Sequence, residues 1–151
     1  MTIRLEIYID GGAKGNPGPS GIGVIICRDG EVIKNVSEFI GKTTNNVAEY
    51  TALIYGLQEA LILKAASVTV YTDSQLLYRQ LRHEYKIKNS NLIGLYNQVR
   101  LLLSGIASFE IRHIPREKNS GADKLVKKAI REATRKKSLI IGDEQKVAAP
   151  D

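Results

Sequence analysis

The sequence of 151 residues is poor in the side chains that build disulfides and transition-metal sites. Its single cysteine, Cys27, excludes an intramolecular disulfide and a zinc site based on cysteine. The two histidines, His83 and His113, lie far apart along the chain and make a poor pair of metal ligands. A disulfide-rich module and a zinc protein are therefore both excluded.

Long hydrophobic segments are also missing. No apolar run reaches the 18 residues that a transmembrane helix needs. The first residues lead directly into a strand-like segment, without the charged and apolar regions of a secretory signal. We therefore expect a cytoplasmic protein without membrane contact.

The length is that of one ordinary domain, and 43% hydrophobic residues are enough for a core. We expect this domain at residues 1–137, a C-terminal tail at residues 138–151, and a monomer. Lysine and arginine number 22 against 16 acidic residues, which gives a net charge of +6. This surplus permits binding to a polyanion, but a solvated basic surface has the same composition.

Three strands are predicted near the start of the chain, the first from strict alternation of apolar and polar residues. The dipeptide Asp29-Gly30 is a strong signal for a tight hairpin, so neighbouring strands are expected to pair antiparallel. Residues 11–19 are rich in glycine and proline and are expected to form a turn. The predicted strands are residues 3–10, 21–28 and 31–40.

The pattern changes to helical spacing after Thr43. Asn45 and Asn46 are good N-caps, and the apolar stripe that follows predicts a helix of about five turns. Such a helix before the β-rich residues 67–72 predicts a crossover, so this fourth strand should lie parallel to the first. Further predicted elements are helices from Ser74, at 91–103 and at 119–136, a fifth strand at 109–114, and a short edge strand at 139–141. The fold class is α/β with a mixed five-stranded sheet.

Four carboxylates lie at the ends of these elements. Asp10 ends the first strand and Asp73 follows the fourth; if these strands are parallel neighbours, their ends lie about 4.8 Å apart. Glu49 and Asp123 fall near the starts of two predicted helices, which could bring them to the same sheet edge. Each residue alone has an ordinary explanation, as a turn or cap residue or as a charge that stabilises the helix dipole.

A cluster of these acids would be costly without a ligand. Two like charges 4 Å apart repel by about 4 kcal/mol at an effective dielectric of about 20. A divalent cation turns this repulsion into coordination, and carboxylates without histidine or cysteine suit Mg²⁺ or Mn²⁺. Two such ions would activate a water and stabilise the leaving oxygen of a phosphodiester.

Four motifs carry a family resemblance. They are I-Y-I-D-G-G-A-K-G-N-P-G-P at residues 7–19, T-T-N-N-V-A-E-Y at 43–50, Y-T-D-S-Q at 71–75, and H-I-P-R-E-K-N-S-G-A-D at 113–123. In this order and spacing they resemble ribonuclease H, type 1. The chain is similar to the short form, which lacks a hybrid-binding domain and a large basic handle.

The resemblance implies a ribonuclease H-like fold, with strands one to three antiparallel, strands four and five parallel to the first, and flanking helices. It implies an endonuclease that hydrolyses the RNA strand of RNA–DNA hybrids and leaves 5′-phosphate and 3′-hydroxyl ends. Double-stranded RNA is a further candidate substrate of the short form. The implied cofactor is Mg²⁺, two ions with substrate bound, with Mn²⁺ as a substitute. The implied ligands are Asp10, which bridges the ions, Glu49, Asp73 and Asp123.

The resemblance also implies substrate contacts. An amide or backbone group can read the 2′-hydroxyls of a wide minor groove without reading sequence. For Asn45 and Asn46, helix capping is the alternative. The matching positions are Gly11, Asn16, Asn46 and Gln75 for the minor groove, and Thr44 and Asn45 for the DNA phosphates.

The chain departs from the family pattern in two places. The basic handle is reduced to a short segment that has no tryptophan and contains Arg79, Arg82, Lys86 and Lys88. Many members carry a histidine on a mobile loop before the fourth acid, but His113 falls in a predicted strand. We interpret it as a partly buried structural residue, with Arg116 or Glu117 as a substitute.

Two other functions fit parts of the pattern. One is a related phosphoryl-transfer domain, of the integrase or reverse-transcriptase-associated kind. The other is an inactive or weakly active nucleic-acid-binding module with the same fold, because fold alone does not establish activity. The complete set of four acids favours the nuclease, since an idle site has no reason to keep their mutual repulsion.

Overall fold

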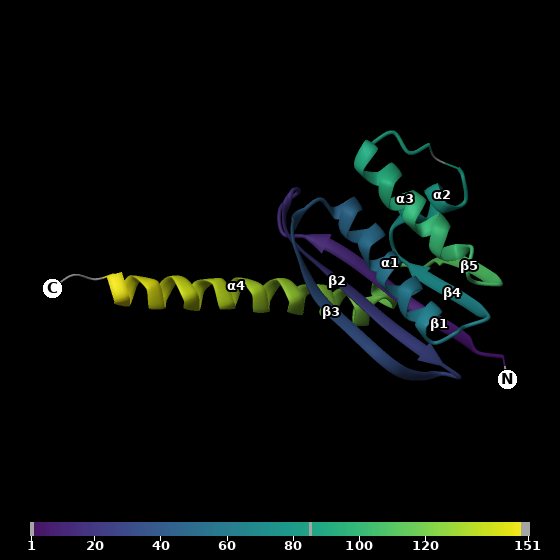
Figure 1. Ribbon diagram of the computed structural model, residues 1–151, viewed down its shortest axis with the longest axis horizontal. Helices are drawn as coiled ribbons and strands as arrows, with labels where there is room; N and C mark the ends of the chain where they lie inside the picture. The colour runs from purple at the N-terminus through teal and green to yellow at the C-terminus, as the bar shows by residue number, and fades with distance from the viewer. Residues whose placement is uncertain (1, 85, 149–151) are drawn as a thin grey trace.

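A computed structural model describes residues 2–84 and 86–148, with side chains described through residue 140 (Figure 1). Its five strands form one sheet in the order β3-β2-β1-β4-β5. The strands are β1 Arg4–Ala13, β2 Gly18–Arg28, β3 Glu31–Thr43, β4 Ser67–Thr72 and β5 Ser108–His113. The helices are α1 Asn45–Ile62, α2 Gln75–Leu81, α3 Ser90–Leu103, the 3-10 turn η1 Arg116–Lys118, and α4 Ser120–Ala148.

The predicted topology is confirmed. Strand β1 pairs antiparallel with β2, and β2 with β3, whereas β1 pairs parallel with β4, and β4 with β5. The β2–β3 turn has positive φ angles at both central residues, 53° at Asp29 and 79° at Gly30. Such a turn matches the twist of the two strands it joins, which is why this dipeptide is a strong hairpin signal.

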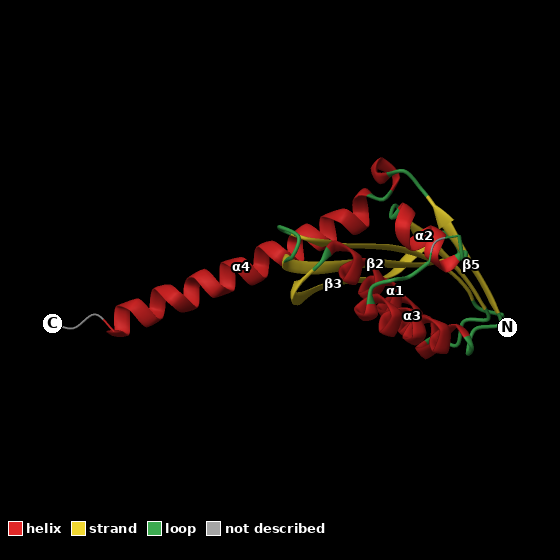
Figure 2. Cartoon of the chain, turned by 90° about the horizontal axis from the view of Figure 1, so that it is seen from above, coloured by secondary structure: helices red, strands yellow, loops and turns green. Residues whose placement is uncertain are grey.

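The sheet lies between two helical layers (Figure 2). Helix α1 covers one face together with α3, and α4 covers β1, β2 and β3 on the other face. On the α1 side, Gly56 lies directly against Ile7 and Ile9 of β1. Leu53 and Leu57 of α1 are fully buried in the same core. Inward-facing residues of β1 and one stripe of α1 thus build the main hydrophobic layer.

The first turns of α4 approach β2 closely because β2 has a glycine there. A Cβ atom at Gly23 would collide with the backbone carbonyl of Ala122. Ala122, Val126 and Ala129 of α4 are buried at this contact. Since Asp123 follows Ala122, this glycine also fixes the distance between the start of α4 and the sheet.

Beyond the sheet, α4 continues as a long projecting helix (Figure 1). The predicted edge strand at residues 139–141 is therefore wrong: these residues are helical, and Leu139 and Ile140 are 62% and 58% exposed. No proline interrupts residues 120–148, and basic and apolar residues favour continuation of the helix. The division at residue 137 into domain and tail stays a prediction.

The predicted turn at residues 11–19 is shorter than expected. Strands β1 and β2 both extend into it and pair through Ala13 and Ser20. The backbone N–H of Lys14 donates to the carbonyl of Pro19 at 2.8 Å and closes the connection.

Among the described residues, no helix combines the length and hydrophobicity that crossing a bilayer requires.

Gly23→Ala should lower the free energy of unfolding by about 2 kcal/mol, because the added methyl must displace α4 from the sheet. Gly94→Ala is the matched control: a Cβ at this position in α3 meets open space, so we expect a gain of about 1 kcal/mol from helix propensity. Urea denaturation measures both values. Equal stabilities of the two variants would contradict the close packing of α4 on β2.

Candidate active site

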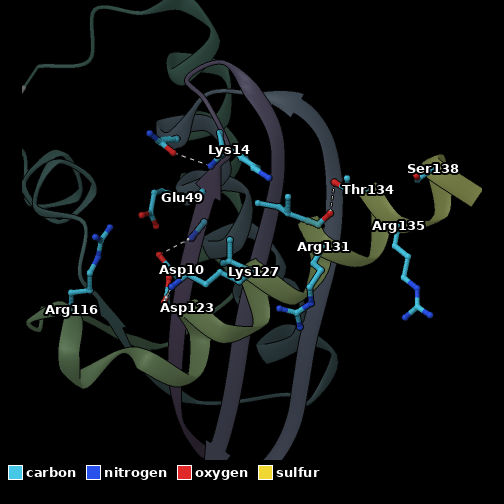
Figure 3. A pocket seen from close by; sticks show the side chains of 16 residues that line it. Asp10, Lys14, Glu49, Arg116, Asp123, Lys127, Arg131, Thr134, Arg135 and Ser138 are labelled. Carbon is cyan, nitrogen blue, oxygen red and sulfur yellow. Dashed lines mark hydrogen bonds and ion pairs between the residues drawn. The ribbon is translucent and has the colours of Figure 1, made fainter.

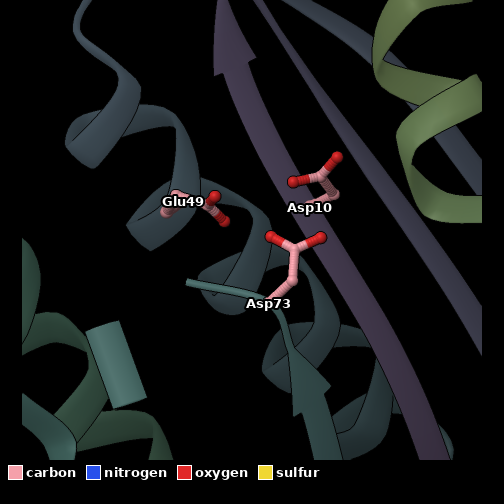
Figure 4. A group of neighbouring side chains, drawn as sticks. All are labelled: Asp10, Glu49 and Asp73. Atoms are coloured by element: carbon pink, nitrogen blue, oxygen red, sulfur yellow. The ribbon is translucent and has the colours of Figure 1, made fainter. Parts of the chain in front are cut away.

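Three of the four predicted acids meet at one edge of the sheet (Figure 4). Asp10 lies on β1, Asp73 directly follows β4, and Glu49 comes from α1. One carboxylate oxygen of each lies within 4.8 Å of the other two. The parallel pairing of β1 with β4, in which Ile9 is opposite Thr72, brings the two aspartates to the same edge.

Glu49 reaches this edge because α1 lies very close to β1. A Cβ atom at Gly11 would collide with the backbone of Ala48, so only glycine permits this approach. The backbone N–H of Gly11 also donates to Oδ1 of Asp10 at 3.0 Å. Glu49 lies past the first turn of α1, which contains no acidic residue. Stabilisation of the helix dipole therefore does not explain why an acidic residue stands at position 49.

Asp123 lies apart from this carboxylate cluster, which consists of Asp10, Glu49 and Asp73. It sits in the first turn of α4, as predicted, and its Oδ2 pairs with Nζ of Lys127 at 2.9 Å. Asp123 nevertheless lines the same cavity as Asp10 and Glu49, which has a volume of about 890 Å³ (Figure 3). The structure thus gathers three acids and places the fourth at the rim.

Two of these carboxyl groups, Asp10 and Glu49, have raised pKa values. Burial, followed by the charges of Asp73 and Asp123, raises the pKa of Asp10 to about 7, against the opposing effects of the Gly11 N–H and Arg116. Burial and the charges of Asp10 and Asp73 raise the pKa of Glu49 well above its ordinary value. Among the described residues, no hydrogen-bond donor reaches the buried Oε2 of Glu49. A cation would satisfy both the excess charge and this oxygen.

These residues fit a divalent metal ion. The donors are carboxylate oxygens, which suit Mg²⁺ or Mn²⁺ better than zinc. Asp10 is 8% exposed and Glu49 9% exposed, so water alone compensates little of their charge. The geometry therefore supports a candidate metal centre at Asp10, Glu49 and Asp73.

Sequence reasoning missed Asn119, which organises the cluster. Its side chain is 2% exposed, and Nδ2 donates to the carbonyl of Ile9 at 2.8 Å and to Oδ2 of Asp73 at 3.2 Å. The amide thus ties Asp73 to β1 at Ile9, next to Asp10. The only sequence signal was its place in the 113–123 motif, where it looks like an ordinary residue before a helix.

The predicted N-caps of α1 need correction. The cap is Thr44, whose Oγ1 accepts from the N–H of Val47 at 3.3 Å. Asn45 instead accepts from the N–H of Ala13 at 2.9 Å, and its own N–H donates to Oδ1 of Asn16 at 3.1 Å. These bonds hold the β1–β2 connection against the start of α1, which is why Asn45 does not cap the helix.

Two other predicted contact residues lie at helix starts near the cluster. Asn46 is half-buried in the first turn of α1. Gln75 is exposed and is the first residue of α2, after its N-cap Ser74. Their roles toward substrate stay predictions.

The interpretation of His113 as a partly buried residue is wrong. It is the last residue of β5, as the pattern indicated, but it is exposed because β5 is an edge strand. Its Nε2 lies 3.3 Å from the carbonyl oxygen of Asp73, and its ring lies 5.9 Å from that of Tyr78. His113 therefore stands beside the carboxylate cluster rather than in the core.

The proposed substitutes for this histidine differ in position. Arg116, on η1, lines the cavity, and its charge lowers the pKa values of Asp10 and Glu49. Glu117 is exposed on the same turn and is not among the residues lining the cavity. Arg116 is thus the better placed of the two.

The reduced basic handle is partly neutralised by its own acid. Arg79 and Arg82 both pair with Glu84, at 3.4 and 3.3 Å. The guanidinium of Arg82 also lies 5.4 Å from the centre of the Tyr78 ring. Lys86 and Lys88 are exposed in the connection between α2 and α3. Among the described side chains, neither Lys86 nor Lys88 has an ion pair, so the handle keeps positive charge for a polyanion mainly at these two lysines.

Comparison with known proteins places this chain and its fold in a family. The chain matches the family described as reverse transcriptase-like over residues 8–129. It is 34% identical to the bifunctional protein Rv2228c of Mycobacterium tuberculosis over 151 residues, which are 99% of this chain and 41% of that protein. The chain thus spans about two fifths of the length of this relative.

The chain is 36% identical to ribonuclease HI of Halobacterium salinarum over 131 residues, which are 86% of this chain and 66% of that protein. The crystal structure of LC11-RNase H1 in complex with an RNA/DNA hybrid has a TM-score of 0.82 and 41% identity, covering 86% of this chain and 99% of that chain. The predicted sheet, the four motifs and these similarities agree. The chain belongs to the reverse transcriptase-like family and, within it, to the ribonuclease H type 1 group.

Proposed function

We propose that this protein is an endonuclease that hydrolyses the RNA strand of RNA–DNA hybrids. The observation that carries the proposal is the meeting of Asp10, Glu49 and Asp73 at the open edge of the sheet. The similar LC11-RNase H1 was crystallised with an RNA/DNA hybrid, which supports the same substrate class here. The alternative is a binding module of the same fold with little or no activity.

The proposed metal ligands are the carboxylate cluster and Asp123. The raised pKa values of Asp10 and Glu49 and the unpaired oxygen of Glu49 support a bound divalent cation. Two Mg²⁺ ions with substrate bound are what the resemblance to ribonuclease H implies, and Mn²⁺ is a chemically similar substitute. When bound, such a pair supplies a nucleophilic water and stabilises the leaving 3′-oxygen, so that 5′-phosphate and 3′-hydroxyl ends result.

The chain's own residues prepare this site. Asn119 fixes the orientation of the Asp73 carboxylate, and the Gly11 N–H does the same for Asp10. Arg116 adds positive charge to the cavity and favours the ionised forms of Asp10 and Glu49. Pre-oriented carboxylates of this kind lose little entropy when they bind a ligand.

The proposed substrate contacts lie around the start of α1, where backbone N–H groups favour an anion. Thr44 and Asn45 would meet DNA phosphates. The minor groove would meet the remaining four positions, Gly11, Asn16, Asn46 and Gln75. Cleavage of double-stranded RNA, a monomeric state and a cytoplasmic location stay predictions.

Asp10→Asn should abolish Mg²⁺-dependent cleavage of a labelled RNA–DNA hybrid, because the amide removes one negative ligand from the cluster. Binding of the hybrid should persist. Gel electrophoresis of the cleavage products and fluorescence anisotropy measure the two properties separately. Unchanged cleavage would refute the metal-binding role of Asp10.

The metal-free protein should lose stability as the pH rises. The pKa of Asp10 is about 7 in the folded protein, whereas that of an isolated aspartate is 3.8, so the native state binds more protons between these limits. The free energy of unfolding should therefore fall from about pH 4 to about pH 7. In EDTA, Asp10→Asn should be about 4 kcal/mol more stable than wild type near pH 8 and similar near pH 4.

Denaturation with urea at both pH values checks this expectation. Excess Mg²⁺ is the control, since it should raise the stability of the wild type near pH 8 more than that of the variant. Parallel pH profiles of the two proteins would contradict the strained carboxylate cluster.

His113→Ala should reduce the cleavage rate less than tenfold, a cost below about 1.4 kcal/mol, because the ring contacts a backbone carbonyl and none of the cluster's carboxylates. Arg116→Gln should cost more, since its charge acts on Asp10 and Glu49. Steady-state kinetics on one hybrid compares both variants. A hundredfold loss in His113→Ala would assign the histidine a direct catalytic role.

A further inference from the structure

The cavity lined by Asp10, Glu49 and Asp123 extends far along α4 (Figure 3). Its lining on this helix begins at Asp123 and reaches Ser138. These positions are 138 − 123 = 15 residues apart, which corresponds to about 22 Å at 1.5 Å per residue. The predicted metal ligands that line it are confined to one end, so most of this groove has no role in the chemistry proposed above.

Beyond Asp123, the charged residues that line the groove are all basic. Lys127, Arg131 and Arg135 follow one another at four-residue intervals on one face of α4, and Lys14 from the β1–β2 connection lines the opposite wall. Lys127 pairs with Asp123. Within the side chains described through residue 140, no carboxylate forms an ion pair with Lys14, Arg131 or Arg135.

The arginines of α4 lie on the groove side of the helix, together with Lys127. Both of its arginines, Arg131 and Arg135, line the groove, whereas Lys128 and Lys136 do not. Arginine presents a planar fork of donors that matches a phosphate, and lysine serves equally well on a solvated surface. Solubility of the helix alone does not require its two arginines to lie on the groove side.

We propose that this basic groove, formed by Lys14, Lys127, Arg131 and Arg135, binds the phosphate backbone of the nucleic-acid substrate beyond the carboxylate cluster. The inference rests on the proposed nuclease function and extends its binding surface. A strand whose scissile phosphate lies at the cluster must continue past it, and the groove is continuous with that position. At about 3.4 Å per base pair, 22 Å accommodates about six steps.

The groove adds to the positive charge of the reduced basic handle. Arg79 and Arg82 share Glu84, so Lys86 and Lys88 are the two cations of the handle that form no ion pair among the described side chains. The groove along α4 supplies positive charge on the other side of the cluster. Phosphate contacts of this kind hold the substrate in register without selecting its sequence.

The double variant Arg131→Gln/Arg135→Gln tests the groove in the full chain. Its control is Lys128→Gln/Lys136→Gln, which removes the same charge from the same helix on positions outside the groove. Affinity is measured by fluorescence anisotropy in an Asp10→Asn background, with a hybrid of about 20 base pairs over a range of salt concentrations. Cleavage kinetics of each double variant with Asp10 intact give the KM.

We expect the groove variant to bind about tenfold more weakly and to show a similar rise in KM, with less than a twofold change in the control. The slope of log affinity against log salt should fall by about 2, because two phosphate contacts are lost. With a hybrid of about 8 base pairs centred on the cleavage site, the difference between the variants should shrink, since fewer phosphates reach the arginines.

Equal affinities of the two double variants, together with normal cleavage by the wild type, would overturn the proposed role of the groove and leave the nuclease function standing. A tenfold loss that is the same for short and long hybrids would also overturn it. A wild-type protein that neither binds nor cleaves hybrids would overturn the groove and the nuclease together.

Discussion

Mutual repulsion among the buried carboxylates is the constraint on which the rest of this structure depends. The backbone holds Asp10, within β1, beside Asp73, which follows the end of the parallel neighbour β4, and the close approach of α1 at Gly11 brings Glu49 to them. The amide of Asn119 prevents Asp73 from turning away. Repulsion among these carboxylates therefore lowers the free energy of unfolding, and a bound cation raises it again. Such a cost is typical of sites that were shaped for a ligand and not for packing.

The same cavity separates charges of opposite sign along its length (Figure 3). Acids occupy the end at the sheet, where a divalent cation fits, and basic side chains of α4 occupy the far end, where a polyanion fits. Asp123 and Lys127 form an ion pair at the boundary between the two. A substrate phosphate needs both environments, since it must reach metal ions through carboxylates that would otherwise repel it. A groove with acidic residues at one end and basic residues at the other can bind the cation and the phosphates at separate places.

Much of the fold could be predicted because the first strand alternates in hydrophobicity and because turns carry specific residues, such as Asp29-Gly30. The meeting of Asp10 and Asp73 followed from parallel pairing alone. The errors have physical causes: the apolar residues near Leu139 fit a short strand or a helix equally well, and a strand pattern does not reveal that His113 lies on a sheet edge. The role of Asn119 depends on a contact with Ile9, which is 110 residues away in sequence.

Anomalous diffraction from a crystal of the protein grown with an RNA–DNA hybrid and Mn²⁺ tests the central claim most directly. We expect two anomalous peaks bounded by Asp10, Glu49, Asp73 and Asp123, next to a phosphate of the RNA strand. An ordered hybrid with no peak among these carboxylates would contradict the metal centre and the mechanism that depends on it.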